Sequence, residues 1–495
     1  MGNLRDTVAG SMAWSMAEKA GTVLLQIVVS FVVARRLAPE DYGVMAILTV
    51  FTAVALILVD SGFSQALIRG PEPSDNDCRA VFGFNMAMSV AAYAVLTLLS
   101  PLLARWYGEP MLARIAPVLL LLLPVNALGV VQNTLLTRRF RFDLISKIVF
   151  VSSLVSGIAA VTMAVAGCGV WSLVAQRVSQ MAVKSALLWR FGGWRFGEGR
   201  REAVGRRRES LGRLAPFGVR ILFTDLINTI YNNVASLFVG RMSVTTLGFF
   251  NQAQKMKDMP VLAITQSVQN VTFPALSAIG GDARKFAESY RKILMMMAFV
   301  MFPVMAGLAA VADDMFALLG RQWMPTVPYF KVLSLTGLFA PLASVALNVL
   351  KVGSDGGAVV RAEIVKKIFM TLALAVTIPM GVGALVWGLV ASAAVDFAVN
   401  VTAASSYSQL GWGGVLRTLL PVAAVSAAMY AAVSAVLGLL PDGGADAVAM
   451  SALRIAAGVA TGAAIYGGLS VMFRLEAAGE AREIFRNFCC GKDKR

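Results

Sequence analysis

The chain has 495 residues, of which 58% are hydrophobic and 15% are charged, and its mean hydropathy is +0.72. Because soluble domains carry about a quarter charged residues, this composition excludes an ordinary soluble protein and indicates an integral membrane protein. The net charge of +16 would favour nucleic-acid binding in a soluble chain. Here the basic residues lie mainly between apolar stretches, which is typical of membrane topology, and we expect no nucleic-acid partner.

Residue types absent from the sequence exclude several functional classes. There is no histidine, which excludes a Ser-His-Asp triad, a histidine-ligated zinc site and a histidine general base. The motif G-x-x-x-x-G-K-[ST] is also absent, so the chain carries no ATPase of its own. The four cysteines fit no metal spacing: Cys78, Cys168, Cys489 and Cys490. We therefore expect no enzymatic activity, no cofactor and no metal.

Apolar stretches of about 20 residues recur along the chain, which is the length of a membrane-crossing helix and about twice that of a barrel strand. The sequence therefore predicts an all-α integral membrane protein with about 14 transmembrane helices. The spans are expected at 13–34, 43–65, 82–104, 115–137, 147–166, 170–189, 216–239, 247–277, 293–312, 328–350, 362–380, 384–405, 415–437 and 452–473.

Lysine and arginine are distributed unevenly between the segments that join these spans. If the N-terminus, the even-numbered loops and the C-terminal tail share one side, that side holds 29 of them and the other side holds 6. Cytoplasmic loops are the ones enriched in lysine and arginine. Both termini are therefore expected in the cytoplasm.

Two motifs mark the opening spans. The first apolar run ends in A-R-R-L-A-P-E-D-Y-G (34–43), where Pro39 cannot continue the helix, so a tight polar hairpin to the next span is predicted. The second run ends in D-S-G-F-S-Q-A-L-I (60–68).

Together with F-x-F-N at 82–85, P-L-L-A-R-W-Y at 101–107 and R-R-x-x-F at 138–142, these motifs resemble the polysaccharide-transporter (Wzx-type) branch of the multidrug/oligosaccharidyl-lipid/polysaccharide exporter superfamily. The resemblance implies a flippase of the bacterial cytoplasmic (inner) membrane. Its implied substrate is a polyprenyl-pyrophosphate-linked oligosaccharide repeat unit for exopolysaccharide, capsule or O-antigen assembly. It also implies alternating access of two lobes, with spans 1, 2, 7 and 8 lining the central cleft.

A short internal repeat also favours two lobes. R-L-A-P-E-D-Y-G (36–43) aligns with R-M-S-V-T-T-L-G (241–248), an offset of 205 residues. Two six-helix lobes in parallel orientation are predicted, followed by two additional C-terminal helices. The predicted domains are an N-lobe at 1–190, a basic cytoplasmic linker at 191–213, a C-lobe at 214–405, and helices 13 and 14 with a cytoplasmic amphipathic tail at 406–495.

The linker and the tail are both expected at the membrane surface. The linker is glycine-rich and basic, which favours a position near anionic lipid headgroups, while docking of a partner remains the alternative. In the tail, residues 475–488 place apolar side chains on one helical face, which is typical of an interfacial helix.

Ionisable groups in a bilayer cost several kcal/mol unless they face a cavity or a partner, so those within the spans are the candidate site residues. Polar residues recur at helical spacing on spans 1, 7 and 8, and a lipid-facing stripe of that kind would be costly. We assign substrate binding to the following cations and amides: Lys19, Gln26, Arg220, Asn228, Asn232, Asn251 and Lys255.

Acids within the spans are the candidates for ion coupling, to H+ or Na+: Glu18, Asp60, Asp225 and Asp396. Structural roles compete for three of them. Glu18 can neutralise Lys19, Asp60 can belong to the turn chemistry of D-S-G, and Asp396, a lone acid among small residues, can be a hydrogen-bonded structural acid. On the sixth span, Lys184 is expected to extend its side chain to the membrane surface.

Four functions remain open, and the flippase is the first choice. A drug or cation antiporter would favour an acidic, aromatic pocket, whereas the candidate cleft is mixed to basic. A peptidoglycan-precursor flippase shares the fold that the resemblance implies, and a membrane-bound ligase or acyltransferase is the enzymatic alternative. The expected partners are the lipid-linked saccharide, membrane lipids, and a polysaccharide polymerase with its export machinery; we expect a monomer.

Overall fold

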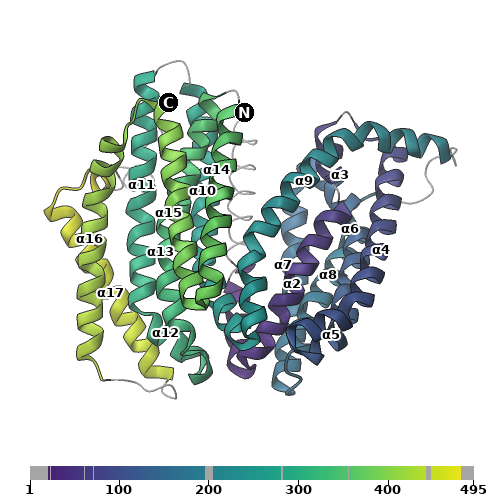
Figure 1. The fold of residues 1–495 in the computed structure, drawn as a ribbon, viewed down its shortest axis with the longest axis horizontal. Helices are drawn as coiled ribbons and strands as arrows, with labels where there is room; N and C mark the ends of the chain where they lie inside the picture. The colour runs from purple at the N-terminus through teal and green to yellow at the C-terminus, as the bar shows by residue number, and fades with distance from the viewer. Residues whose placement is uncertain are drawn as a thin grey trace, which may run out of the picture. The chain divides into compact units, whose positions relative to one another are not determined.

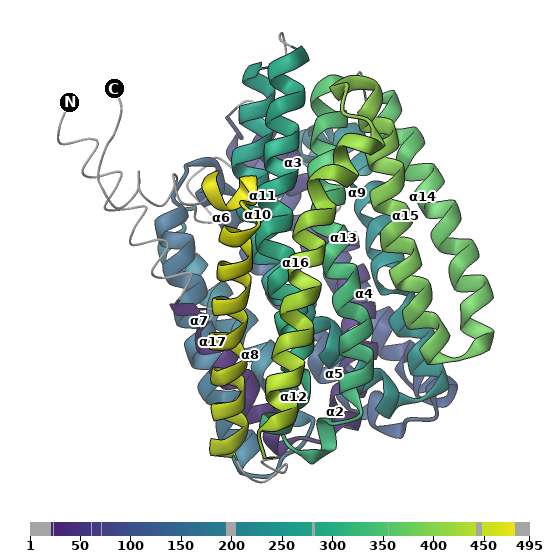
Figure 2. The same cartoon turned by 90° about the vertical axis from the view of Figure 1, so that its left-hand side faces the viewer.

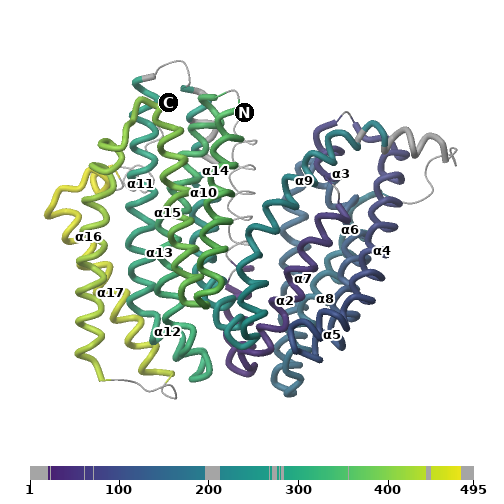
Figure 3. The backbone as a smooth tube through the Cα atoms, in the orientation of Figure 1, coloured from purple at the N-terminus to yellow at the C-terminus, as the bar shows by residue number. Residues whose placement is uncertain are grey.

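The computed structural model describes residues 21–22, 24–60, 62–70, 72–194, 204–279, 283–354, 356–441 and 448–480 (Figure 3). Every regular element in these ranges is a helix, and they contain no strand. The prediction of an all-α protein is confirmed.

The helices follow one another with short connections (Figure 1). Residues 24–36 are helical and precede the first labelled helix. The helices up to the middle of the chain are α2 (Pro39–Asp60), α3 (Phe63–Arg69), α4 (Asp75–Tyr107), α5 (Pro110–Leu120), α6 (Leu122–Arg138), α7 (Phe142–Val165), α8 (Trp171–Phe191), α9 (Val204–Met242) and α10 (Val244–Ile279). The later ones are α11 (Ala283–Ala310), α12 (Ala312–Leu319), η1 (Arg321–Trp323), α13 (Thr326–Gly353), α14 (Gly357–Thr377), η2 (Ile378–Met380), α15 (Val382–Ser408), α16 (Trp412–Leu439) and α17 (Val448–Met472).

Local sequence signals set several of these helix ends. Ser74 caps α4, because its hydroxyl accepts the backbone N–H of Asp77 (3.2 Å) while the Asp77 carboxylate accepts the Ser74 N–H (3.1 Å). Gly108 ends the same helix in the left-handed region, with φ of 71°. Pro110 opens α5, where its missing N–H costs no hydrogen bond.

Nine of the described helical segments are long and apolar enough to cross a membrane. Four more are long enough but more polar: α8 and α14 have 21 residues each, α9 has 39 and α10 has 36. The protein is therefore a multi-pass membrane protein. The count of fourteen spans stays a prediction, since the first span lies partly outside the described residues.

The chain forms two compact units, Met1–Gly248 and Phe249–Arg495. In the first unit, α9 packs against α2, α3 and α4, and Figure 1 shows α9 running alongside α2. The sequence analysis instead divided the chain within α9. It placed residues up to 213 in the linker and the rest of α9 in the C-lobe, whereas the structure has all of α9 in the first unit. The assignment of six helices to each lobe stays a prediction.

The two segments that the internal repeat aligns contact each other inside the first unit. A Cβ atom on Gly43 would lie 2.0 Å from the carbonyl oxygen of Val244, and a Cβ on Gly248 would lie 2.0 Å from the carbonyl oxygen of Pro39. With the 205-residue offset, Gly43 is equivalent to Gly248 and Pro39 to Val244. In each contact, the glycine of one copy of the repeat therefore packs against a carbonyl oxygen of the other copy, and the two oxygens lie at equivalent positions. Only glycine, which has no Cβ atom, fits at either position.

A hydrogen bond between side chains also joins two residues that are equivalent in the repeat. The Thr245 hydroxyl donates to the Glu40 carboxylate (2.9 Å), and these residues are also equivalent in the repeat. The first turns of α2 and α10 thus cross by a reciprocal backbone contact.

The core of the second unit lies between α11, α13, α15 and α16, where Met301, Val349 and Val401 are fully buried. Helix α14 packs on α15, and α17 packs on α16 and α12. Figure 2 shows α16 and α17 side by side. The two helices predicted as additions to the lobes are therefore packed onto this unit.

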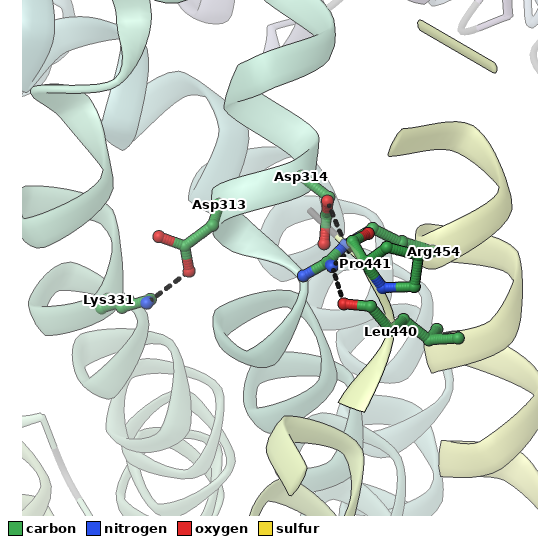
Figure 4. Close-up of polar contacts among 6 residues, drawn as sticks. All are labelled: Asp313, Asp314, Lys331, Leu440, Pro441 and Arg454. Carbon is green, nitrogen blue, oxygen red and sulfur yellow. Dashed lines mark hydrogen bonds and ion pairs between the residues drawn. The ribbon is translucent and has the colours of Figure 1, made fainter. Parts of the chain in front are cut away.

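A buried arginine fixes α17 to α12 (Figure 4). Arg454 is 8% exposed, and its Nε donates to Asp314 Oδ1 (2.8 Å). One of its Nη atoms donates to the carbonyl oxygens of Leu440 (2.9 Å) and Pro441 (3.1 Å), just after α16. A single guanidinium therefore joins α12, α17 and the segment after α16.

Charges also join the start of the predicted tail helix to α11. Arg291 donates two hydrogen bonds to the Glu476 carboxylate (2.6 and 2.8 Å), and Lys292 pairs with Glu480 (2.8 Å). These hydrogen bonds from Arg291 hold the pKa of the Glu476 carboxyl below its ordinary value. The tail beyond residue 480, and with it most of the predicted interfacial face, lies outside the described residues.

Candidate functional site

Three of the predicted site residues belong to the first span. Glu18 and Lys19 lie outside the described residues. Gln26 belongs to the described helical segment 24–36, where its side chain is exposed, whereas Ser30 on the same predicted stripe is buried.

Helix α9 carries four of the predicted residues. Arg220, Asn228 and Asn232 are exposed, and Asp225 is half-buried. The spacing of three and four residues places Asp225, Asn228 and Asn232 on one face of α9. The first unit therefore presents a charged and amide-bearing face on a helix that is 39 residues long.

Two predicted ion-coupling acids belong to helices of the first unit that pack against each other, α2 and α9. Asp60 accepts a hydrogen bond from the Ser64 hydroxyl of α3. Asp225 belongs to α9, which packs against α2 and α3. Gly62 makes this approach possible: its φ is +69°, and a Cβ there would lie 2.5 Å from the Gly218 carbonyl oxygen of α9.

Asp60 and Asp225 are the two candidate acids that lie in the described part of the first unit. Their part in ion coupling stays a prediction.

The remaining predicted residues belong to the second unit. On α10, Asn251 is half-buried and Lys255 is exposed. The neighbouring Lys257, which the sequence analysis did not single out, donates to the Thr336 hydroxyl of α13 (3.2 Å) and pairs with Asp258 (2.8 Å). Substrate binding by Asn251 and Lys255 stays a prediction.

Asp396 is not the lone acid that its sequence neighbours indicated. Its carboxylate pairs with Lys366 Nζ (3.1 Å), which comes from the adjacent helix α14 and also pairs with Glu363. Lys366 is almost buried, with a side chain 9% exposed. Four residues on, Asn400 is buried and donates to the Ala343 carbonyl oxygen of α13 (3.0 Å).

The first unit also contains a partly open cavity of about 410 Å³ that the sequence analysis did not predict. Its walls come from α2, α5, α6, α7 and α8. The residues that line it are Met45, Thr49, Thr52, Ala53, Leu56, Leu119, Leu122, Val149, Ser152, Arg177, Gln180, Met181 and Lys184.

Two cations give this cavity its charge. Arg177 and Lys184 are seven residues apart on α8, so with Gln180 and Met181 they share one face of that helix. Lys184 thus lines the cavity, and the extension of its side chain to the membrane surface stays a prediction. The spacing was visible in the sequence, but it could not tell whether that face meets lipid, protein or a cavity.

The described residues offer no group of three or more cysteine and acidic side chains that could hold a metal ion.

Comparison with known proteins gives consistent matches. The model of the family described as polysaccharide biosynthesis protein matches residues 32–328. The succinoglycan biosynthesis transport protein ExoT of Rhizobium meliloti is 26% identical over 344 residues, 68% of each chain. The teichuronic acid biosynthesis protein TuaB of Bacillus subtilis is 23% identical over 354 residues, covering 69% of this chain and 70% of its own. The lipopolysaccharide biosynthesis protein WzxC of Escherichia coli is 24% identical over 341 residues, 68% of each chain.

Among solved structures, the lipid II flippase MurJ in its inward closed conformation is similar, with a TM-score of 0.71. The match covers 93% of this chain and 99% of that one at 13% sequence identity. At this identity the likeness shows the fold alone.

Proposed function

Because the chain belongs to the polysaccharide biosynthesis protein family, we propose that it is a flippase for polyprenyl-pyrophosphate-linked oligosaccharide repeat units. It moves them from the inner to the outer leaflet of the bacterial cytoplasmic membrane, where they serve exopolysaccharide, capsule or O-antigen assembly. Family membership also confirms the resemblance drawn from the motifs at 34–43 and 60–68.

The observation that carries the proposal is a contrast among the long helices. Within the described residues, nine segments are apolar enough to cross a membrane, whereas α8, α9, α10 and α14 are long enough but carry charged and amide side chains. Such side chains are costly in lipid unless they face water or a partner. Lys366 of α14 has acid partners and two cations of α8 face a cavity, so α9 and α10 are the helices expected to line a hydrophilic path. A path of this kind suits a sugar head group, while the polyprenyl tail stays in the lipid.

The proposed mechanism uses the polar faces of α9 and α10. Arg220 and Lys255 pair with the pyrophosphate, where charge-assisted hydrogen bonds are strongest, and Asn228, Asn232 and Asn251 bond the sugar hydroxyls. Two lobes then alternate between inward and outward access, driven by an H+ or Na+ gradient through acids such as Asp60 and Asp225. The chain itself catalyses no covalent step, and both of its termini lie in the cytoplasm.

Deletion in the native host tests this proposal. We expect loss of one surface polysaccharide, with its lipid-linked repeat units accumulating on the cytoplasmic side. The measurement is the surface glycan profile together with extraction and mass spectrometry of the lipid-linked saccharides. An unchanged glycan profile with increased drug sensitivity would instead favour an antiporter.

The binding roles are tested separately. Replacing Arg220 or Lys255 with Ala should reduce polysaccharide export by about tenfold, the effect of losing about 1.4 kcal/mol of binding. The amount of protein in the membrane should stay the same. Lys147→Ala, an exposed cation at the start of α7, is the matched control and should export normally. Normal export by both α9 and α10 variants would mean that the substrate pocket lies elsewhere.

A further inference from the structure

The cavity lined by Arg177 and Lys184 has no part in the mechanism proposed above. We infer that it is a binding site for an oxyanion of the phosphate class. The ligand is either the pyrophosphate of the lipid-linked saccharide, in which case the inference rests on the proposed function, or a free phosphate or pyrophosphate ion.

The charge of the lining selects an anion. Of the residues that line the cavity, two are cations and none is an acid. Within the described part of the chain, neither Arg177 nor Lys184 forms an ion pair with a carboxylate. Two cations that face one cavity repel a cationic ligand. A bound anion would supply the negative charge that the lining residues lack.

The depth of the two cations makes an unoccupied site costly. Arg177 lies six residues from the first residue of α8 and Lys184 seven from its last, so each is about 9 Å or more from the nearer end along the axis. A helix of 21 residues is about as long as the bilayer core is thick. Both charges therefore lie in the middle of a membrane-length helix, where a charge is retained when it faces a ligand path or a partner.

The hydrogen-bond donors of the lining point to the same ligand. The hydroxyls of Thr49, Thr52 and Ser152 donate to backbone carbonyl oxygens of their own helices at 2.7, 2.7 and 2.9 Å. Gln180 donates to the Ser153 hydroxyl (3.2 Å). The N–H groups left for a ligand are mainly those of the guanidinium and the ammonium, which are donors only and match phosphate oxygens.

The size of the cavity is suitable for a small ligand. Its volume of about 410 Å³ lies within the range typical of small-molecule sites, about 300–1,000 Å³. All of its walls belong to the first unit, so the site is complete without the second.

Binding to the purified full chain in lipid nanodiscs tests the inference. The probes are inorganic phosphate, inorganic pyrophosphate, farnesyl pyrophosphate and farnesol, titrated by isothermal calorimetry. We expect at least one of the phosphate probes to bind, and the double variant Arg177→Gln, Lys184→Gln to bind it at least about tenfold more weakly. Arg177→Lys keeps the charge and should lose less. Arg190→Gln, an exposed cation on the same helix that stacks on Phe191, is the matched control and should bind as the wild type.

The probes separate the two sources of the ligand. Binding of an inorganic probe assigns the site to a free anion, and binding of farnesyl pyrophosphate alone assigns it to the lipid-linked head group. The inference is overturned if no phosphate probe binds the wild type, if farnesol binds as well as farnesyl pyrophosphate, or if the double variant binds as the wild type. Because the two cations have no carboxylate partner to leave unpaired, the double variant should keep the wild-type melting temperature or exceed it, which separates lost binding from misfolding.

The two proposals can fail independently. If deletion of the chain leaves the surface polysaccharide intact while the double variant loses pyrophosphate binding, the proposed function fails and the anion site stands. If deletion abolishes the polysaccharide but the double variant binds pyrophosphate normally, the anion site fails and the proposed function stands.

Discussion

At the scale of single residues, the cations on the long helices differ in what surrounds them. Arg454 has Asp314 and two carbonyl oxygens as partners, and Lys366 pairs with Asp396 and a second acid. Arg177 faces a cavity instead. A cation with a complete set of protein partners stabilises the fold, whereas one that faces a cavity is available to a ligand.

Removing the ion pair between Arg454 and Asp314 tests whether a cation with protein partners stabilises the fold. Asp314→Asn leaves a buried guanidinium without its counter-charge, and we expect the free energy of unfolding to fall by about 3 kcal/mol or more. Detergent-titrated unfolding in mixed micelles measures the difference.

The adjacent acid supplies the control. Asp313 pairs with Lys331 (2.6 Å), but the two side chains are 53% and 37% exposed (Figure 4). Asp313→Asn should therefore cost less than about 1 kcal/mol. Equal losses for the two variants would show that burial of the pair has no effect on stability.

Candidate residues can be proposed from the sequence, but the partners of their side chains cannot. Asp396 and Lys366 are 30 residues apart and lie on different helices, so no spacing along one helix reveals their ion pair. The same limit applies to Lys184, because helical periodicity gives a face and not what that face meets. Only the packing of α8 against its neighbours places this lysine in a cavity.

At the scale of elements, the crossing of α2 and α10 depends on glycine. The carbonyl oxygens of Pro39 and Val244 occupy the positions that side chains on Gly248 and Gly43 would need. The alignment of these segments was read from the sequence as a repeat. The contact between the two copies could not be predicted in this way, because an alignment shows which residues are equivalent and not which residues are close in space.

Replacing either glycine with alanine should disrupt the contact between the first turns of α2 and α10. A Cβ atom 2.0 Å from a backbone oxygen cannot be accommodated without moving the helix, so Gly43→Ala and Gly248→Ala should each lower the melting temperature and the yield of folded protein. Gly83→Ala on α4 is the control, because nothing lies within 4 Å of a Cβ there. It should keep or slightly raise stability. Wild-type stability in both crossing variants would contradict the close contact.

At the scale of the whole molecule, the distribution of charge predicts how the chain is oriented. The side with 29 lysines and arginines is expected in the cytoplasm, together with both termini. The turn between α7 and α8 then faces the opposite side, and it carries the exposed thiol of Cys168.

Thiol labelling tests this orientation. A membrane-impermeant maleimide should label Cys168 in intact spheroplasts, because that thiol is exposed and predicted to lie outside, whereas Cys489 and Cys490 should react only after permeabilisation. Gel-shift of the labelled protein measures the reaction, and Cys168→Ser serves as the blank. If Cys168 reacts only after permeabilisation, the predicted orientation is inverted.

The sequence by itself determined the class of this protein, its helical character and its family, because hydropathy, helical period and the hairpin motif are properties of contiguous residues. The tertiary structure alone decided which polar faces meet an acid, a carbonyl oxygen or a cavity. That information depends on contacts between helices that are far apart in the chain, and a buried charge is stabilised or left available for a ligand by those contacts.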